Sequence, residues 1–153
     1  ATSCQGVVCA VLTADCLPVF FCNKQGTEVA VAHAGWRGLH AGILSATLAS
    51  MKSPAEDIMV SLGPAIGPEA FEVGQDVYDA FVSKGSANSA AFVATDHTHY
   101  LCDIYQLARV ELSAWGVKSI AGGGHCSFSE APLFYSYRRQ NTTGRMASLI
   151  WLG

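Results

Sequence analysis

The distribution of apolar residues along the chain predicts alternating strands and helices. Residues 7–13 are apolar and rich in valine, which is typical of a buried strand. Two further apolar runs, 17–22 and 28–33, are separated by the turn-forming sequence Asn23-Lys24-Gln25-Gly26, and this arrangement predicts a hairpin. Strands are also expected at 57–62, 118–121 and 146–152.

Three segments have the spacing of helices. They are residues 38–52, 74–83 and 103–115, the last with Asp103 as an expected N-cap. The segment 63–68 is broken by proline and glycine, and 84–90 is a small, polar loop. Because helices and strands interleave while the hairpin is antiparallel, we expect a mixed α/β fold. This would be one layered domain over residues 1–153, whose mixed sheet includes the 17–22/28–33 hairpin and has flanking helices.

Composition excludes several classes of protein. The chain of 153 residues is 50% hydrophobic and 14% charged, which excludes a disordered chain, a coiled coil and a collagen. A net charge of −3 without a basic run argues against a non-specific nucleic-acid binder, and no apolar stretch is long enough to cross a membrane. The low charge indicates that another segment, a subunit or a packed site covers some of the surface.

The start of the chain and its cysteines bear on the cellular compartment. The chain starts with Ala-Thr-Ser and has no initiator methionine, so we expect the natural protein to have an additional N-terminal segment. No basic stretch of the secretory type precedes the first apolar run. The six cysteines are therefore expected to be reduced thiols of a cytoplasmic protein.

Cys16 and His33 lie at the ends of the predicted hairpin. A two-residue loop at Lys24-Gln25 would place them directly opposite each other, with Cβ atoms about 4.5–5.5 Å apart. The pair could then share a metal ion or act as a nucleophile and its base. The alternative is a buried cysteine packed beside a hydrogen-bonded histidine. A catalytic zinc ion would need a third protein ligand, from elsewhere in the chain or from the missing segment.

Residues next to this pair are candidates for supporting roles. Asp15 could orient a ligand or accept a proton, or it could be an ordinary turn carboxylate. The turn at residues 34–38 leads from a strand into a helix, where Arg37 could bind an anion and Trp36 could face a ring, or Trp36 could belong to the core. Arg138, Arg139 and Arg145 either bind an anion or pair with Glu72, Asp103 or Glu130.

A weaker set of metal-ligating residues occurs later in the chain. His97 and His99 are followed by Cys102, a spacing that metal sites use. These residues lie in a polar loop that enters a strand, so a metal site is the less favoured interpretation of them.

Several of these segments together resemble one protein family. They are Thr13-Ala14-Asp15-Cys16-Leu17-Pro18, the run from Ala32 to Gly38, Leu62-Gly63-Pro64-Ala65-Ile66-Gly67, Phe71-Glu72-Val73, the run from Phe134 to Arg139, and Thr143-Gly144-Arg145-Met146-Ala147-Ser148. In this order they are similar to the YfiH/laccase-domain family. The resemblance extends over essentially the whole chain but covers only the later part of a family member.

The resemblance implies a zinc centre with one cysteine and two histidine ligands. Cys16 and His33 match two of the three, and the other histidine belongs to an upstream Gln-x-His-Gly-type motif without a counterpart here. The implied activity is phosphorolysis of purine nucleosides (adenosine, inosine, methylthioadenosine), with adenosine deamination beside it. The other activities proposed for the family are copper-dependent polyphenol oxidation and removal of serine from a peptidoglycan precursor, for which Cys16 and His33 would form a hydrolase dyad.

The residues present rank these activities. A multicopper site needs clustered histidines, whereas the five histidines of the chain are scattered. Deamination needs a metal-activated water and a proton shuttle, a role that Asp15 could take. Phosphorolysis needs a phosphate site, at Arg37 or at Arg138 and Arg145, and an aromatic face for the base, at Trp36 or Phe71. A non-catalytic domain that binds a partner stays an alternative, and the sequence leaves the oligomeric state open.

Overall fold

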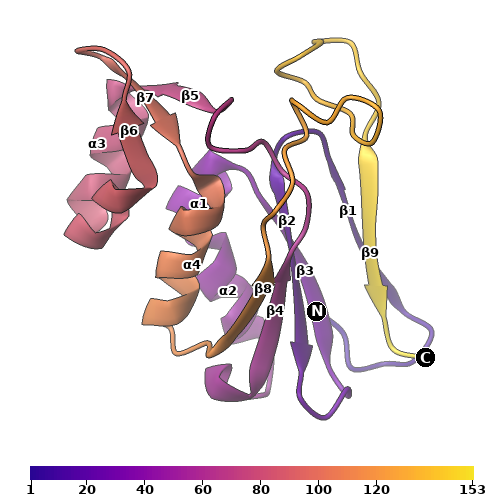
Figure 1. The fold of residues 1–153 in the computed structure, drawn as a ribbon. Helices are drawn as coiled ribbons and strands as arrows, with labels where there is room; N and C mark the ends of the chain where they lie inside the picture. Colours follow the sequence, from indigo (N-terminus) through magenta and orange to yellow (C-terminus); the bar gives the residue numbers. More distant parts are fainter.

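A four-stranded mixed sheet forms the centre of the structure (Figure 1), and this confirms the predicted α/β class. The computed structural model describes all residues, 1–153. The strand order is β3-β2-β4-β8, in which only β4 and β8 run parallel. The bounds of these strands are β2 (Leu17–Asn23), β3 (Val29–Ala34), β4 (Ile58–Leu62) and β8 (Ser119–Gly122).

Two smaller sheets flank the central one. The first is an antiparallel ribbon of β1 (Val8–Thr13) and β9 (Met146–Trp151), which joins the two ends of the chain. The second has the order β5-β7-β6 and was not expected from the sequence; its strands are β5 (Glu72–Gly74), β6 (Phe92–Ala94) and β7 (His99–Cys102). Strands this short carry too little periodicity to be recognised in the sequence.

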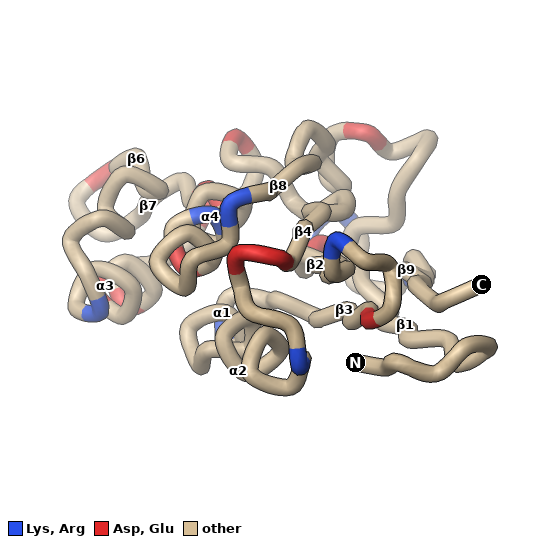
Figure 2. The backbone as a smooth tube through the Cα atoms, turned by 90° about the horizontal axis from the view of Figure 1, so that it is seen from below, with Lys and Arg blue, Asp and Glu red and all other residues tan.

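Helices cover one face of the central sheet, and the β1–β9 ribbon lies on the other side of β3 (Figures 1 and 2). Those at the central sheet are α1 (Trp36–His40), α2 (Ile43–Ser50) and α4 (Ile104–Ala114), whereas α3 (Gln75–Lys84) packs against β5 and β7. The short 3₁₀ turns are η1 (Ala55–Asp57) and η2 (Ser86–Ala91). None of the helices combines the length and the apolar character that crossing a bilayer requires.

The core lies between the helices and the sheet. Large side chains from β2, α2 and α4 are fully buried there, among them Leu17, Phe21, Leu44, Leu107 and Leu112. Burial of each such side chain stabilises the fold by about 1.5–3 kcal/mol. The predicted N-cap of α4 is also confirmed, since the Asp103 side chain accepts a hydrogen bond from the Gln106 amide.

The predicted helix over 38–52 is wrong in one respect, because it is divided into α1 and α2. Gly42 lies between them with a φ of 86°, a left-handed conformation that ends α1. As a result, α1 is a single turn that follows directly from β3.

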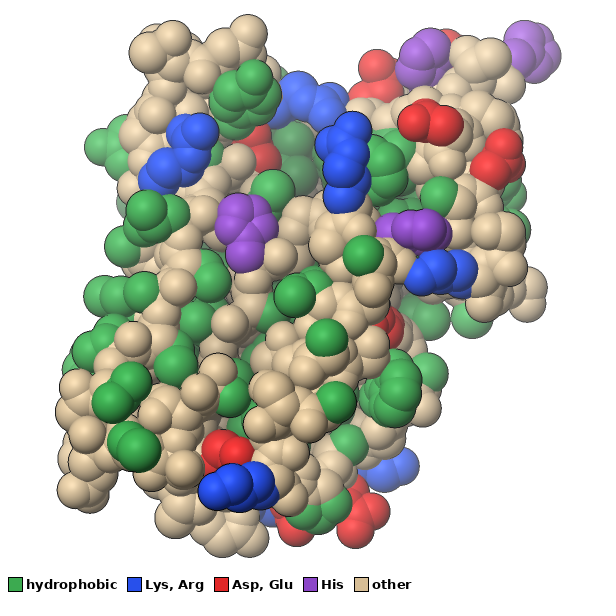
Figure 3. Space-filling model, turned by 180° about the vertical axis from the view of Figure 1, so that it is seen from behind, with side chains coloured by type: hydrophobic (Ala, Val, Ile, Leu, Met, Phe, Trp, Pro, Cys, Tyr) green, Lys and Arg blue, Asp and Glu red, His purple; other side chains and the backbone are tan.

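The strand at 7–13 was expected to be buried, and this expectation is wrong. Val8 and Leu12 of β1 and Leu149 and Trp151 of β9 are each about half exposed. Figure 3 shows apolar side chains along the edge of the molecule that carries the β1–β9 ribbon. Figure 2 shows how few charges the chain carries. The low charge of the sequence therefore corresponds to a real apolar surface on this ribbon.

One buried carboxylate fixes the connection after α2. Glu28 lies at the start of the hairpin's second strand and accepts hydrogen bonds from the Lys52 amide at 2.8 Å and from the amide and hydroxyl of Ser53 at 3.2 and 3.1 Å. Burial by itself would raise the pKa of Glu28, but these hydrogen bonds outweigh it and hold the pKa below the ordinary 4.5.

We expect Glu28→Gln to destabilise the protein by about 1.5–3 kcal/mol at neutral pH, because an amide nitrogen would face N–H donors. Since the folded-state pKa is lowered, this stabilisation is present above the ordinary pKa and is lost as the pH falls through the folded-state pKa. Urea unfolding of both proteins at pH 7 and at acidic pH tests this. The exposed Glu56→Gln is the control, and a constant difference between pH 7 and acidic pH would contradict the assignment.

Candidate active site

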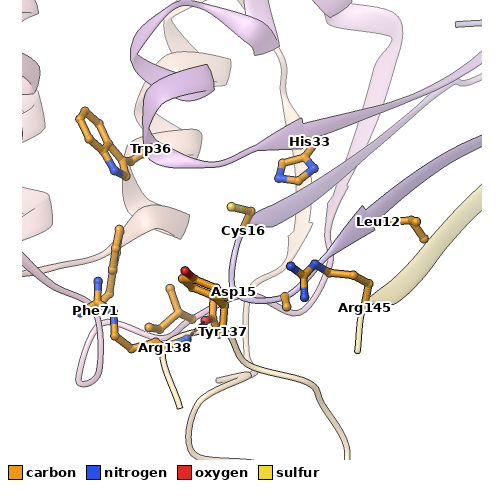
Figure 4. A pocket seen from close by; sticks show the side chains of 11 residues that line it. Leu12, Asp15, Cys16, His33, Trp36, Phe71, Tyr137, Arg138 and Arg145 are labelled. Carbon is orange, nitrogen blue, oxygen red and sulfur yellow. Dashed lines mark hydrogen bonds between the residues drawn. The ribbon is translucent and has the colours of Figure 1, made fainter. Parts of the chain in front are cut away.

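A pocket of about 410 Å³ opens beside the ends of β1, β2 and β3 (Figure 4). Its volume is within the range of small-molecule sites. Most of the side chains expected from the sequence to act together do line it. The lining consists of Leu12, Ala14, Asp15, Cys16, His33, Trp36, Ile66, Phe71, Tyr137, Arg138 and Arg145.

Cys16 and His33 reach this pocket by a register that differs from the expected one. Pro18, not Cys16, pairs with His33, and the hairpin loop is formed by residues 24–27. The cause is Asn23, whose side-chain oxygen accepts from the amides of Thr27 and Glu28 and so stabilises a longer loop. The shift is two residues, and a strand places every second residue on the same face, so Cys16 and His33 still share a face as diagonal neighbours.

The position that faces Cys16 is a glycine. A Cβ atom on Gly35 would lie 2.8 Å from the Cys16 sulfur, so the thiol lies over the bare backbone of the turn into α1. His33 is exposed, and its ring is directed into the pocket beside Cys16 (Figure 4). The expectation that the pair could be an ordinary part of the core is therefore wrong.

Arginines and aromatic rings form the rest of the pocket wall. Arg138 lies over the ring of Phe71 at 5.7 Å, and its Nη1 donates to the carbonyl of Glu72 at 3.1 Å. Arg145 extends from the start of β9 toward Cys16 (Figure 4), and its Nη1 donates to the carbonyls of Thr143 and Gly144. Tyr137 also lines the pocket. It was missed as a site residue, although it belongs to the 134–139 motif.

Arg37 does not line the pocket, contrary to expectation. It is exposed and its guanidinium lies over the Trp36 ring at 4.4 Å, while Trp36 itself does line the pocket. Successive helical residues point in different directions, and of these two only Trp36 reaches the cavity. In addition, a helix of one turn provides little dipole to hold an anion.

The other expected clusters have structural roles. Arg139 pairs with no carboxylate, and its guanidinium instead donates to the carbonyls of Ser127, Phe128 and Phe134. Cys102 is fully buried while His99 is exposed, so this part of the chain forms no metal cluster.

Two buried hydroxyl groups hold the loops that surround the pocket. The Tyr105 hydroxyl accepts from the amide of Ala65 at 2.7 Å and donates to the carbonyl of His125 at 2.8 Å, and burial raises its pKa to about 12. Ser127 is fully buried and donates to the Asp15 carboxylate at 2.6 Å. Sequence patterns could not identify Tyr105 and Ser127 as important, because the hydrogen-bond partners of each lie far away in the chain.

The electrostatic surroundings of Cys16 favour the neutral thiol. Burial is the main cause that raises its pKa, and the neighbouring Asp15 carboxylate adds to it, while Arg145 opposes the shift. The thiol of Cys126 behaves differently. Burial would raise its pKa too, but hydrogen bonds from Ser129, Gly67 and Phe128 lower it.

Comparison with known proteins places this geometry in a family. The sequence profile described as "Multi-copper polyphenol oxidoreductase laccase" matches residues 1–153. The chain belongs to this laccase-like family. The family includes proteins named YfiH, so the resemblance found in the sequence is confirmed.

Two curated relatives of the laccase-like family carry enzyme names. The chain is 58% identical over 147 residues to "Purine nucleoside phosphorylase YfiH" of Escherichia coli, covering 96% of this chain and 60% of that protein. It is 55% identical over 148 residues to "Purine nucleoside phosphorylase PA4543" of Pseudomonas aeruginosa, covering 96% and 61%. The chain thus spans about three fifths of the length of these relatives.

Solved structures of the laccase-like family have the same fold. Neisseria meningitidis protein NMB0706 superposes with a TM-score of 0.94 at 55% identity, over 95% of this chain and 60% of that one. Bacillus licheniformis protein YfiH superposes with a TM-score of 0.92 at 30% identity, over 99% and 60%.

The two cysteines provide a test of the electrostatics. In the metal-free chain we expect alkylation of Cys16 by iodoacetamide to rise with a midpoint above pH 9.0, and that of Cys126 below it. Arg145→Gln should raise the Cys16 midpoint further, since it removes the nearby positive charge. Peptide-resolved mass spectrometry measures both sites in one sample. A Cys16 midpoint below that of Cys126 would contradict the assignment.

Proposed function

We propose that the natural protein carrying this chain is a cytoplasmic, zinc-dependent purine nucleoside phosphorylase that also deaminates adenosine. The observation that carries the proposal is the single pocket that joins a thiol, an imidazole, two arginines and three aromatic rings. The names of the relatives support phosphorolysis. The six free cysteines fit a reducing compartment.

The donor atoms of the pocket fit zinc. A cysteine sulfur and a histidine nitrogen are the ligands that zinc prefers, and they lie on one face of the β2–β3 hairpin. The described residues contain no group of three His, Cys, Asp or Glu side chains suited to a metal. Because a catalytic zinc needs three protein ligands, we propose that the third comes from outside residues 1–153.

The state of the Cys16 thiol favours a metal ligand over a free nucleophile. Reactive cysteines have a lowered pKa, whereas burial and Asp15 raise that of Cys16. A bound metal ion displaces the thiol proton, so the raised pKa does not prevent ligation. These observations disfavour a metal-free Cys16/His33 hydrolase that acts on a peptidoglycan precursor.

The remaining walls suit a nucleoside and phosphate. Trp36, Phe71 and Tyr137 offer flat apolar faces for a purine, and Arg138 and Arg145 offer N–H donors for phosphate oxygens. When bound, zinc would supply an activated water for deamination and charge stabilisation for developing anions. The protein's own contribution is to hold the base, the ribose and the phosphate in one cavity that is shielded by apolar side chains.

We expect Cys16→Ala and His33→Ala to lose bound zinc and to lower phosphate-dependent inosine cleavage by about 100-fold or more. Indirect partners of metal ligands already contribute about 10–100-fold, and direct ligands contribute more. Elemental analysis and an inosine–phosphate assay on the natural protein measure both quantities. Cys22→Ala and His97→Ala are matched controls outside the pocket. Full zinc content in the Cys16 variant, or several copper ions per chain in the wild type, would refute the proposal.

The phosphate site can be located by a comparison of arginines. Arg145→Gln and Arg138→Gln should each raise the KM for phosphate by about tenfold or more, since each loses a charge-assisted hydrogen bond. Arg37→Gln should change this KM by less than about twofold, because Arg37 is exposed and does not line the pocket. Steady-state kinetics at varied phosphate give the answer. A large effect at Arg37 alone would contradict this assignment and indicate that phosphate binds at the start of α1.

A further inference from the structure

Asp15 has an unusual backbone conformation for a residue with a side chain. Its φ is 84°, and it is the one non-glycine residue of the chain with a positive φ. Aspartate and asparagine are enriched in this left-handed region because their short polar side chains can bond locally. Such a conformation is unfavourable for a residue with a Cβ atom and persists only where surrounding contacts hold it.

The contacts of Asp15 connect the β1–β2 turn to three distant segments. Its main-chain carbonyl accepts from the Ile66 amide at 2.9 Å. One carboxylate oxygen accepts from the Ser127 hydroxyl at 2.6 Å, and the other accepts from the Arg138 amide at 2.7 Å. Ile66 and Arg138 line the pocket, and Ser127 is fully buried behind it.

Arg138 is therefore held at two points. Its main chain is bonded to the Asp15 carboxylate, and its guanidinium is bonded to the Glu72 carbonyl and stacked on Phe71. The neighbouring Tyr137 belongs to the same turn and lines the same cavity. If the hydrogen bond to Asp15 were lost, the guanidinium of Arg138 would keep its partners, but the Arg138 main chain would be free to move.

We propose that Asp15 is a positioning residue that holds the turn at residues 137–139, so that Arg138 and Tyr137 face the substrate pocket. This inference rests on the proposed function and replaces the expectation that Asp15 transfers a proton. Both carboxylate oxygens already accept short hydrogen bonds from the protein. Their partners are a buried hydroxyl and a main-chain N–H, and together they fix the position of the carboxylate.

Asparagine and glycine at position 15 separate positioning from proton transfer. Asparagine tolerates the left-handed backbone; its oxygen can accept from the Arg138 amide, and its NH₂ group can donate to Ser127, whose hydroxyl rotates to accept. Glycine keeps the backbone conformation without strain but removes both side-chain hydrogen bonds. If Asp15 instead transferred a proton, both variants would lose that function equally, because neither side chain has a carboxylate.

The experiment measures kinetics and backbone protection in the natural protein. Asp15→Asn should keep kcat/KM for inosine within about threefold of wild type. Asp15→Gly should raise the KM for phosphate by about tenfold or more, with a smaller fall in kcat, because the Arg138 amide and the Ser127 hydroxyl each lose a charge-assisted hydrogen bond. Hydrogen exchange of peptides covering residues 134–140 should be faster in the glycine variant and close to wild type in the asparagine variant.

A double variant checks the route through Ser127. In Asp15→Asn/Ser127→Ala the asparagine NH₂ has no acceptor, so the rescue should be lost and exchange over 134–140 should increase. Asp57→Asn, which removes an exposed carboxylate paired with Lys24, is the control and should leave all measurements unchanged.

Three outcomes would overturn the inference. One is an asparagine variant as impaired as the glycine variant, the second is a glycine variant with wild-type kinetics, and the third is a double variant as active as Asp15→Asn. If the wild type does not cleave inosine with phosphate, the proposed function fails, and hydrogen exchange alone decides on Asp15. Faster exchange in the glycine variant but not in the asparagine variant would support positioning. Equal exchange in all three proteins would overturn it.

Discussion

The antiparallel pairing of β2 with β3 is the constraint on which the pocket depends. It places the Cys16 thiol above the bare backbone of Gly35 and directs the His33 ring to the same side of the sheet. Side chains on a strand alternate between faces, so a slip of one residue would separate the sulfur from the imidazole. The loop that the Asn23 side chain stabilises fixes the register. A turn at one end of the hairpin therefore determines which side chains lie close together at the other end.

The pocket is closed by a segment that carries little regular structure. Residues 123–145 contain no strand or helix, yet they supply Tyr137, Arg138 and Arg145 to the wall. Hydrogen bonds of Asp15 and Tyr105 connect this segment to the rest of the chain, and the guanidinium of Arg139 bonds one part of the segment to another. The wall of the pocket thus depends on polar contacts between distant parts of the chain.

The low charge of the chain is reflected in an apolar surface on the β1–β9 ribbon. The β1–β9 ribbon has apolar residues on both of its faces, and several of them are half exposed. The pocket contains two residues that can hold a metal ion, although a catalytic zinc needs three protein ligands.

By itself the sequence determined the α/β class, most of the elements of the central sheet and the group of residues at the pocket, because these follow from local periodicity and from motifs. It did not determine the hairpin register, the break of the 38–52 helix at Gly42, the sheet of short strands or the orientation of Arg37. The tertiary structure also gave Asp15, Tyr105 and Ser127 their roles. Their partners are between 20 and 123 residues away, and hydrogen bonds over such separations leave no periodic signal in a single sequence.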